Sequence, residues 1–207
     1  ALVVNDGPSA AAAGVFTANR VKAAPVLWSE QVLAGGQVRA VVLNAKYANA
    51  CTGPAGFQIS HGTAEAVADA LGIGAGEVAV CSTGKIGEPP PLDALISGVA
   101  SAVSVLSTDG GSDAADAIRT TDTVAKEAVA DRDGWSVGGM AKGAGMLAPS
   151  LATMLCVVTT DAVAEPAALD QALRNATALT FDRIDSDGCM STNDTVLLLA
   201  SGASGVT

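Results

Sequence analysis

Thr153 is the residue of this sequence whose surroundings best suit nucleophilic chemistry. It follows a small residue, Ala152, and opens an apolar run, and the segment before it is rich in glycine and alanine. Such residues let the backbone adopt strained or closely packed conformations, so we expect the Thr153 hydroxyl to attack the carbonyl carbon of Ala152. Cleavage there would leave Thr153 as a chain terminus with its α-amino group beside its own hydroxyl. An N-terminal amine is a known activating base for threonine, so the segment predicts self-cleavage followed by acyl chemistry.

The single histidine of the chain argues for that unusual base. His61 stands in a context that is typical of a helix start, Ser60-His61-Gly62-Thr63. One histidine in this context supplies neither a multi-histidine metal site nor a Ser-His-Asp triad. A nucleophile in this chain therefore needs another base, and an α-amine with an ordinary pKa near ~7.7–8.0 suits the task.

Lys142 is the one cation in the glycine-rich segment before Thr153. A lysine is most often a solvated surface residue, and that alternative stays open here. The glycine and alanine around it weaken the alternative, because a backbone without bulky side chains can approach a ligand closely. Lys142 is therefore a candidate for contact with a ligand.

A second candidate site is the turn after an expected strand, Cys81-Ser82-Thr83-Gly84. Backbone amides and a hydroxyl in such a turn can point at one oxygen, as an oxyanion requires. A phosphate-binding loop is excluded, because Ala79 and Ile86 stand where that motif needs glycine and Ser or Thr. An ordinary tight turn remains the alternative for Thr83 and Gly84.

Two further polar runs have simple explanations. Residues 183–194 partly match a calcium-binding EF-hand loop, but Arg183 stands at its first position and Asp194 at its twelfth, where a bidentate Glu is needed. A hydrogen-bonded turn before the last strand explains this run better. The run Thr120-Thr121-Asp122-Thr123 is able to cap a helix or close a turn.

The composition excludes several classes of protein. The 207 residues are 49% hydrophobic and 15% charged, which suits one domain with a buried core. A net charge of −10, without a basic cluster, disfavours nucleic acid as a partner. The most apolar stretch, residues 92–106, is too short and too polar to span a bilayer. The chain begins in an apolar run without a basic leader, so we expect no signal peptide, and its start resembles the interior of a longer protein.

The four cysteines form neither a C-x-x-C pair nor a zinc-finger spacing. A reduced, cytoplasmic protein follows most simply. Free cysteine behaves as a small hydrophobe, so we expect each to be buried and inert. They are Cys51, Cys81, Cys156 and Cys189.

Strands and helices are mixed along the chain, without repeats or linkers. The patterns predict strands over residues 1–4, 12–17, 38–43, 77–81, 135–140, 153–160 and 195–201. They predict helices over residues 63–71, 89–106, 113–119 and 165–180, with a loop at 109–112.

These motifs together resemble the bifunctional ornithine acetyltransferase / glutamate N-acetyltransferase family of arginine biosynthesis. The similarity is most specific in Lys142-Gly-Ala-Gly-Met146 followed by Pro149-Ser-Leu-Ala-Thr-Met-Leu155, and it runs from Ala1 to Thr207. Further matching motifs are Ala50-Cys-Thr-Gly53, Cys81-Ser-Thr-Gly84, Ala117-Ile-Arg-Thr-Thr-Asp-Thr123, Thr159-Thr-Asp-Ala162 and Ser191-Thr-Asn-Asp-Thr195. The alanine-rich, lysine-poor composition resembles that of actinobacterial proteins.

The resemblance implies a mechanism and a set of site residues. The precursor is expected to cleave between Ala152 and Thr153, and Thr153 then takes the acetyl group of N-acetylornithine and passes it to glutamate, with ping-pong kinetics. Thr83 and Gly84 match the oxyanion-hole positions of the family, and Thr120, Lys142 and Thr153 match its substrate-binding positions. No metal or organic cofactor is implied, although some members also accept acetyl-CoA as a co-substrate.

The resemblance also implies an α/β (α+β) fold of stacked mixed sheets flanked by helices, of the self-cleaving N-terminal-nucleophile type. Residues 1–207 then form one domain or part of one, with 1–152 similar to the family's α chain and 153–207 to the start of its β chain. The two chains are expected to stay associated as α2β2. Family members are roughly twice as long, and their C-terminal half, which adds substrate contacts, is missing here.

The sequence departs from the family pattern near the proposed oxyanion site. Lys46 and Tyr47 replace two glycines, and Lys85 replaces an apolar residue and adds a cation beside Thr83 and Gly84. Two alternatives to the acetyltransferase stay open, and these differences favour the second of them. The first is a related aminopeptidase or amidohydrolase, in which the same N-terminal threonine passes its acyl group to water. The second is an inactive, truncated homologue.

Overall fold

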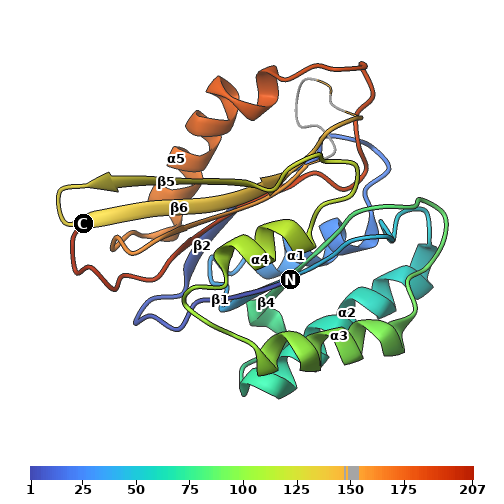
Figure 1. The fold of residues 1–207 in the computed structure, drawn as a ribbon, viewed down its shortest axis with the longest axis horizontal. Coiled ribbons are helices and arrows are strands. Elements are labelled where there is room, and N and C mark those ends of the chain that lie inside the picture. The colour runs from blue at the N-terminus through green and yellow to red at the C-terminus, as the bar shows by residue number, and fades with distance from the viewer. Residues whose placement is uncertain (147, 149–153) are drawn as a thin grey trace.

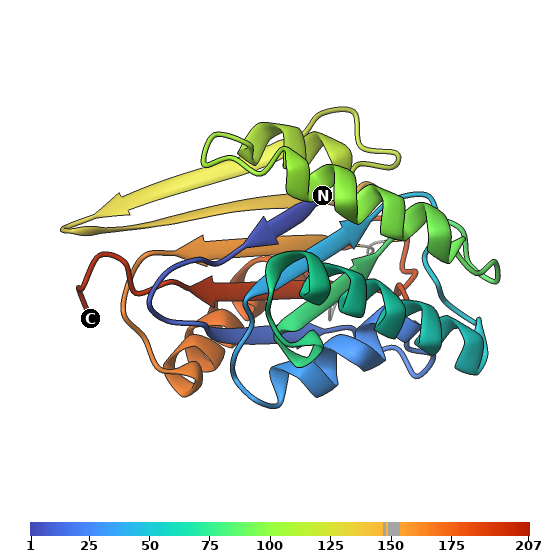
Figure 2. The same cartoon turned by 90° about the horizontal axis from the view of Figure 1, so that it is seen from below.

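The computed structural model of the chain describes residues 1–146, 148 and 154–207. Two β-sheets lie face to face between layers of helices (Figures 1 and 2). The smaller sheet has the strand order β1-β3-β4 and the larger has the order β2-β8-β7-β6-β5. Both are mixed, since β3–β4 and β7–β8 are parallel pairs and the other pairs are antiparallel. The expected fold of stacked mixed sheets with flanking helices is thus confirmed.

The elements have the following bounds. The strands are β1 (Leu2–Val4), β2 (Ala11–Phe16), β3 (Ala40–Asn44), β4 (Val78–Ser82), β5 (Lys126–Arg132), β6 (Trp135–Lys142), β7 (Leu155–Thr160) and β8 (Thr195–Ala200). The α-helices are α1 (Ala24–Leu33), α2 (Gly53–Leu71), α3 (Leu92–Ser104), α4 (Gly111–Ala117) and α5 (Pro166–Leu179), and short 3-10 turns occupy Ala75–Glu77 and Phe181–Arg183.

The central core lies between the two sheets. Val41, Leu43 and Cys81 of the smaller sheet pack against Leu155 and Leu197 of the larger one in a single apolar cluster. β7 and β8 are covered on both faces, which explains why their sequences read as nearly continuous apolar runs rather than as alternating patterns.

Helices cover the two outer faces of this sandwich (Figure 1). Ala64 and Val67 of α2 and Val99 of α3 bury the outer face of the smaller sheet. Leu169 and Leu173 of α5 bury the outer face of the larger sheet. Among the residues that the structure describes, no helix is long and apolar enough to cross a membrane.

Three elements differ from the sequence predictions. Helix α1 was not expected, and α2 begins at Gly53 rather than at residue 63, because its first turns contain proline and glycines that obscure the helical pattern. The prediction that His61 marks a helix start was therefore wrong. His61 lies inside α2, half-exposed, with its ring 4.9 Å from that of Trp28.

Strand β5 was also missed, because all of its residues are exposed and carry no apolar alternation. The signal that predicts it is the dipeptide Asp133-Gly134, which joins β5 to β6 with Arg132 paired to Trp135. Asp-Gly is a strong signal for a two-residue hairpin turn, and Gly134 has the positive φ of 88° that such a turn requires.

The topology brings five strand ends together at one edge of the sandwich. β3 and β4 are parallel and end at Asn44 and Ser82, while β7 and β8 are parallel and start at Leu155 and Thr195. β6 runs antiparallel to β7, so its last residue, Lys142, pairs with Leu155 at the same edge. Polar residues next to these strand ends therefore lie in one region of the structure.

Candidate active site

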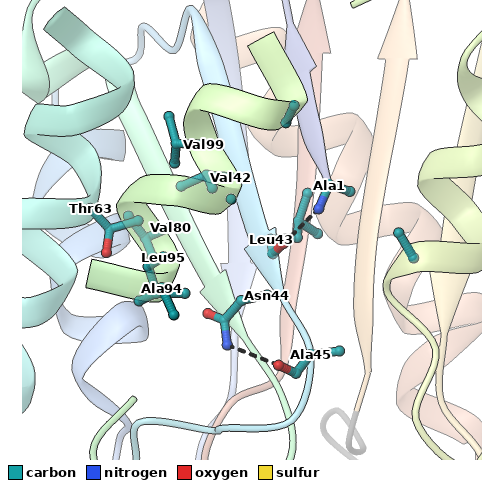
Figure 3. Close-up of a pocket in the computed structure, with 13 residues that line it drawn as sticks. Ala1, Val42, Leu43, Asn44, Ala45, Thr63, Val80, Ala94, Leu95 and Val99 are labelled. Carbon is teal, nitrogen blue, oxygen red and sulfur yellow. Dashed lines mark hydrogen bonds between the residues drawn. The ribbon is translucent and has the colours of Figure 1, made fainter. Parts of the chain in front are cut away.

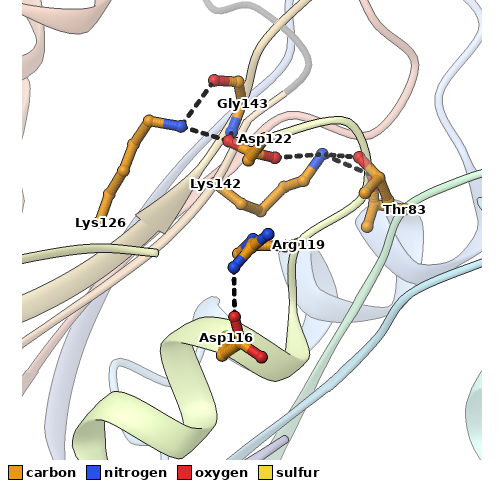
Figure 4. A network of polar contacts seen from close by, with 8 residues as sticks. Thr83, Asp116, Arg119, Asp122, Lys126, Lys142 and Gly143 are labelled. Carbon is orange, nitrogen blue, oxygen red and sulfur yellow. Dashed lines mark hydrogen bonds and ion pairs between the residues drawn. The ribbon is translucent and has the colours of Figure 1, made fainter. Parts of the chain in front are cut away.

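Lys142 is a buried cation at the centre of this edge. Only 2% of the residue is exposed. Its Nζ donates hydrogen bonds to the hydroxyl oxygens of Thr83 at 3.2 Å and Thr120 at 2.8 Å, and it lies 4.0 Å from Oδ2 of Asp122 (Figure 4). The sequence placed Lys142 in a flexible glycine-rich stretch, either solvated or at a ligand. The structure excludes the solvated alternative, because β6 continues two residues beyond the expected end and carries the side chain inward.

The surroundings of Lys142 set its charge. Burial lowers the pKa of Lys142, the nearby carboxylates of Asp122 and Asp194 oppose this effect, and the ammonium of Lys126 adds to it. The net result is a pKa below the ordinary value for lysine. Lys142 thus holds its proton less firmly than a surface lysine does.

Asp122 is the buried carboxylate of the cluster. Its Oδ1 accepts hydrogen bonds from Lys126 Nζ and from the backbone N–H of Gly143. Burial alone raises the pKa of Asp122, but these hydrogen bonds and the charges of Lys142 and Lys126 outweigh it, so its pKa lies below the usual value. Asp122 is therefore ionised at neutral pH.

Thr83 and Gly84 follow β4 and present two different donors. The backbone N–H of Thr83 donates to Asn44 O at 3.0 Å and is therefore occupied, whereas its hydroxyl accepts from Lys142 and keeps its own hydrogen available. Gly84 is exposed, and its N–H has no acceptor among the described residues. The Thr83 hydroxyl and the Gly84 N–H are the groups here that can donate to an oxyanion.

Gly84 is required by a close approach of two loops. Its φ is 129°, and a Cβ at this position would lie 2.2 Å from the backbone carbon of Lys46. The loops are joined by hydrogen bonds from Lys85 N to Lys46 O and from Ala48 N to Lys85 O, both 2.9 Å. Lys46, which stands where the family pattern has a glycine, adopts a positive φ of 82° in this contact.

Lys85 does not add a cation to the oxyanion region in the way that the sequence suggested. Its side chain is 72% exposed, and its Nζ lies 3.4 Å from Glu88. The Lys85 charge faces solvent and a carboxylate, while only its backbone lines the loop contact.

Asp194 is a second buried carboxyl at this edge, just before β8. It is 0% exposed, and its Oδ1 accepts a 2.9 Å hydrogen bond from Met154 N. Burial raises the pKa of Asp194 to about 7, although Met154 N–H, the nearby hydroxyls of Ser191 and Thr17 and the charge of Lys142 oppose the shift. Its Oδ2 has no hydrogen-bond partner within the described part of the chain.

Asn193 ties the two sheets together beside Asp194. Its Nδ2 donates to Ala48 O at 2.6 Å and to Ser82 O at 2.9 Å. A buried amide with both donors used holds the loop before β8 against the end of β4. The sequence motifs that contain Asp122, Asn193 and Asp194 did not predict a part in the active site for these residues, because their partners lie up to 145 positions away.

The predicted nucleophile Thr153 and its neighbour Ala152 lie outside the described residues. Of the predicted site residues, the structure brings Thr83, Thr120 and Lys142 into direct contact, and Gly84 adjoins Thr83. The described residue that follows Thr153 in the sequence is Met154, which is buried and bound to Asp194.

An apolar cavity of about 210 Å³ lies between the smaller sheet and α3 (Figure 3). Asn44 and Thr63 are the polar side chains among the residues that line it. Thr83, Thr120 and Lys142 do not line this cavity, so it is separate from the charged cluster.

The remaining sequence expectations have mixed outcomes. Among the described residues, no group of three or more His, Cys, Asp or Glu side chains is arranged to hold a metal ion. The EF-hand-like run forms a turn in which Gly188 N–H donates to Asp185.

The four cysteines divide into two buried and two exposed residues. Cys81 and Cys156 are buried, and burial raises the pKa of both thiols to about 12. Cys51 and Cys189 are exposed, so the expectation of burial was wrong for those two.

Comparisons with known proteins give one consistent result. The family model described as the ArgJ family matches residues 1–207. The "Arginine biosynthesis bifunctional protein ArgJ" of Streptomyces coelicolor is 72% identical over 207 residues, which are 100% of this chain and 54% of that protein. The protein of the same name from Mycobacterium leprae is 68% identical, and 53% of it is covered. The chain thus spans about half the length of the curated relatives that it matches, and these relatives agree with the expected actinobacterial affinity.

Two solved structures extend the comparison. An ornithine acetyltransferase from Mycobacterium tuberculosis, complexed with ornithine, superposes with a TM-score of 0.70 at 60% identity, over 72% of this chain and 81% of that one. The arginine biosynthesis bifunctional protein from Bacillus halodurans superposes with a TM-score of 0.59 at 31% identity, over 74% and 81% of the two chains.

Proposed function

The chain belongs to the ArgJ family, and we propose that the protein moves an acetyl group from N-acetylornithine to glutamate through an acetylated Thr153. The observation that carries this proposal is the contact of Lys142 Nζ with both the Thr83 and the Thr120 hydroxyl. It joins an oxyanion donor and two substrate-binding candidates in one site. The ornithine bound in the similar mycobacterial structure supports the substrate class.

Two half-reactions follow from a single nucleophile. The Thr153 hydroxyl oxygen attacks the acetyl carbonyl carbon of N-acetylornithine, and its proton passes to the α-amine of Thr153. The acetyl C–N bond then breaks, and the ornithine amine leaves with that proton. The amine of glutamate attacks the acetyl ester next, so that N-acetylglutamate forms and the Thr153 hydroxyl is restored.

The described residues have distinct parts in this scheme. The Thr83 hydroxyl and the Gly84 N–H donate to the oxyanion that forms on the acetyl oxygen in each half-reaction. Lys142, with the exposed Thr120 beside it, binds the α-carboxylate that N-acetylornithine and glutamate share. Both substrates then present their nitrogen to the same point, which a ping-pong exchange requires.

Processing and assembly complete the proposal. The bond between Ala152 and Thr153 is cut by the chain itself, and the two products stay together and pair as α2β2. No metal or organic cofactor takes part, and acetyl-CoA serves at most as an additional acetyl donor. Free cysteines among the described residues support a reducing, cytoplasmic setting.

The test of the proposal combines chain mass and acetyl transfer. Intact mass spectrometry of the purified protein is expected to give two chains that meet at residues 152 and 153, and Thr153→Ala to give one uncut chain. Thr159→Ala, which removes an exposed hydroxyl from β7, is the matched control and should cleave normally. Normal cleavage of Thr153→Ala would contradict the assigned nucleophile.

Assays of the processed protein separate acetyl transfer from the alternatives. Formation of N-acetylglutamate from N-acetylornithine and glutamate, without net release of acetate, supports the transferase. Release of acetate or of peptide products, with no transfer, would instead show a hydrolase. An uncut chain without either activity would show an inactive homologue.

A further inference from the structure

Asp122 lies between two lysines and faces them with different oxygens (Figure 4). Its side chain is 0% exposed. Oδ1 accepts from Lys126 Nζ and, at 2.7 Å, from Gly143 N. Oδ2 has no hydrogen bond among the described residues and lies 4.0 Å from Lys142 Nζ, which is an ion pair rather than a hydrogen bond. Asp122 therefore acts on Lys142 mainly through its charge.

The ammonium of Lys126 binds groups of the protein itself. Its Nζ is bound to Asp122 and also donates to Gly143 O at 3.2 Å, so Asp122 and Lys126 together hold both polar groups of the Gly143 backbone. Gly143 directly follows Lys142. The pair thereby orients the end of β6 from which Lys142 projects.

Lys142 has one N–H group that is available to a ligand. Its ammonium has three N–H groups, of which two are used by Thr83 and Thr120, and within the described part of the chain no third acceptor is at hydrogen-bond distance. Such an ammonium can take up one carboxylate oxygen of a ligand. It can do so only while it stays protonated, and burial works against that.

The charged groups around Lys142 decide whether its ammonium stays protonated. The groups that act on it are the carboxylates of Asp122 and Asp194, which favour its protonated form, and the ammonium of Lys126, which disfavours it. Asp122 is the first of these three in strength. Asp194, whose pKa is raised to about 7, is also ionised in the alkaline range, but its effect on Lys142 is the smallest of the three.

We propose that Asp122, held by Lys126 and Gly143, is a positioning residue that keeps buried Lys142 protonated and so sets the alkaline limit of substrate-carboxylate binding. This proposal rests on the proposed function for the identity of the substrate. Its electrostatic part concerns Lys142 alone and can be tested without turnover.

The test measures the titration of Lys142 directly. The intact protein is labelled with lysine carrying ¹³C at Cε, and the Lys142 resonance is identified by its loss in Lys142→Arg. Asp122→Asn keeps an oxygen for Gly143 N–H but removes the charge, so the titration midpoint of Lys142 should fall by about one pH unit or more. Lys126→Met removes a repelling cation and should raise the midpoint.

Asp116→Asn is the matched control, since Asp116 is an exposed carboxylate near the cluster that pairs with Arg119 instead. It should leave the midpoint of Lys142 unchanged. An unchanged midpoint in folded Asp122→Asn, or shifts of the same sign in Asp122→Asn and Lys126→Met, would overturn the proposal. Opposite shifts cannot arise from a general loss of packing, and Lys126→Met remains informative if Asp122→Asn fails to fold.

A pH profile connects this result to catalysis. The alkaline limb of the kcat/KM profile for N-acetylornithine should shift to lower pH in Asp122→Asn and to higher pH in Lys126→Met. In both variants the change should arise mainly from KM. If the midpoints shift while the native protein transfers no acetyl group, the proposed function fails and the role of Asp122 toward Lys142 stands. If transfer is normal and neither the midpoints nor the limbs move, the role of Asp122 is refuted alone.

Discussion

The backbone N–H of Met154 donates a 2.9 Å hydrogen bond to Oδ1 of Asp194, which lies 40 positions further along the chain. Both residues are buried, and Thr195 N in turn donates to Met154 O at 3.0 Å. The residue that follows the proposed nucleophile is thus fixed on both sides of its backbone. Lys142, at the end of the neighbouring strand, adds its charge to the same region.

Asp194→Asn should change how stability depends on pH. The folded-state pKa of Asp194 is raised to about 7, above an unfolded value of ~3.9, so the folded state retains a proton that the unfolded state has lost. Its contribution to the free energy of unfolding is therefore greatest below pH ~4 and falls by at most about 4 kcal/mol as pH rises to about 7. Asparagine cannot ionise, so the variant should lack this fall.

Urea denaturation at several pH values between 4 and 8 measures the effect. The free energy of unfolding of the variant, taken relative to the native protein, should rise with pH. Asp170→Asn removes an exposed carboxylate from α5 and is the control, which should leave the slope as it is. Parallel curves for Asp194→Asn and the native protein would refute the ionisation argument.

Gly84→Ala should destabilise the fold and reduce activity. A Cβ at residue 84 meets the backbone of Lys46 at 2.2 Å and the φ of 129° is unfavourable for alanine, so we expect a loss of roughly 3 kcal/mol or more. Gly87→Ala measures the cost of the backbone conformation alone. The φ of Gly87 is 85°, but a Cβ built there has no atom within 4 Å apart from its chain neighbours. Its cost should stay near ~1–2 kcal/mol in the same denaturant series. Equal losses in the two variants would show that the loop contact is unimportant.

Lys142→Met should reduce kcat/KM for N-acetylornithine by about 10- to 200-fold, since a hydrogen bond to a charged group contributes about 1.5–3 kcal/mol. Lys142→Arg should restore little, because a planar guanidinium with donors in a fixed fork would replace the compact ammonium that contacts the Thr83 and Thr120 hydroxyls. Steady-state kinetics with Lys85→Met as control test this, because Lys85 is exposed and paired with Glu88. A large effect of Lys85→Met would restore the idea that its charge acts on the oxyanion region.

The cysteines should divide into two classes toward a thiol reagent. Iodoacetamide at pH 8 should modify the exposed Cys51 and Cys189 in the native protein. Cys81 and Cys156 are buried, and a pKa of about 12 leaves almost no thiolate, so they should react only in denaturant. Peptide mass spectrometry locates the labels, and native modification of Cys81 would contradict its position in the core.

Several features followed from local patterns. The apolar runs of β7 and β8 and the amphipathic pattern of α5 were predicted within two residues at most ends, because burial on a regular element leaves a periodic trace in the sequence. Strand β5 and the first half of α2 leave no such trace. The former is exposed throughout, and the latter begins in proline and glycine.

By itself, the sequence determined the family, the mixed α/β layering and the residue types that are able to react. It could do so because the sequences of motifs and the hydrophobic periodicity are local properties of the chain. Only the tertiary structure decided that Lys142 is buried rather than solvated, that Lys85 faces solvent, and that Asp122 and Asp194 act at the site. These outcomes depend on which strand ends meet at one edge of the sandwich. Contacts between residues 59 positions apart, such as Thr83 and Lys142, arise from chain topology and burial, which no local pattern records.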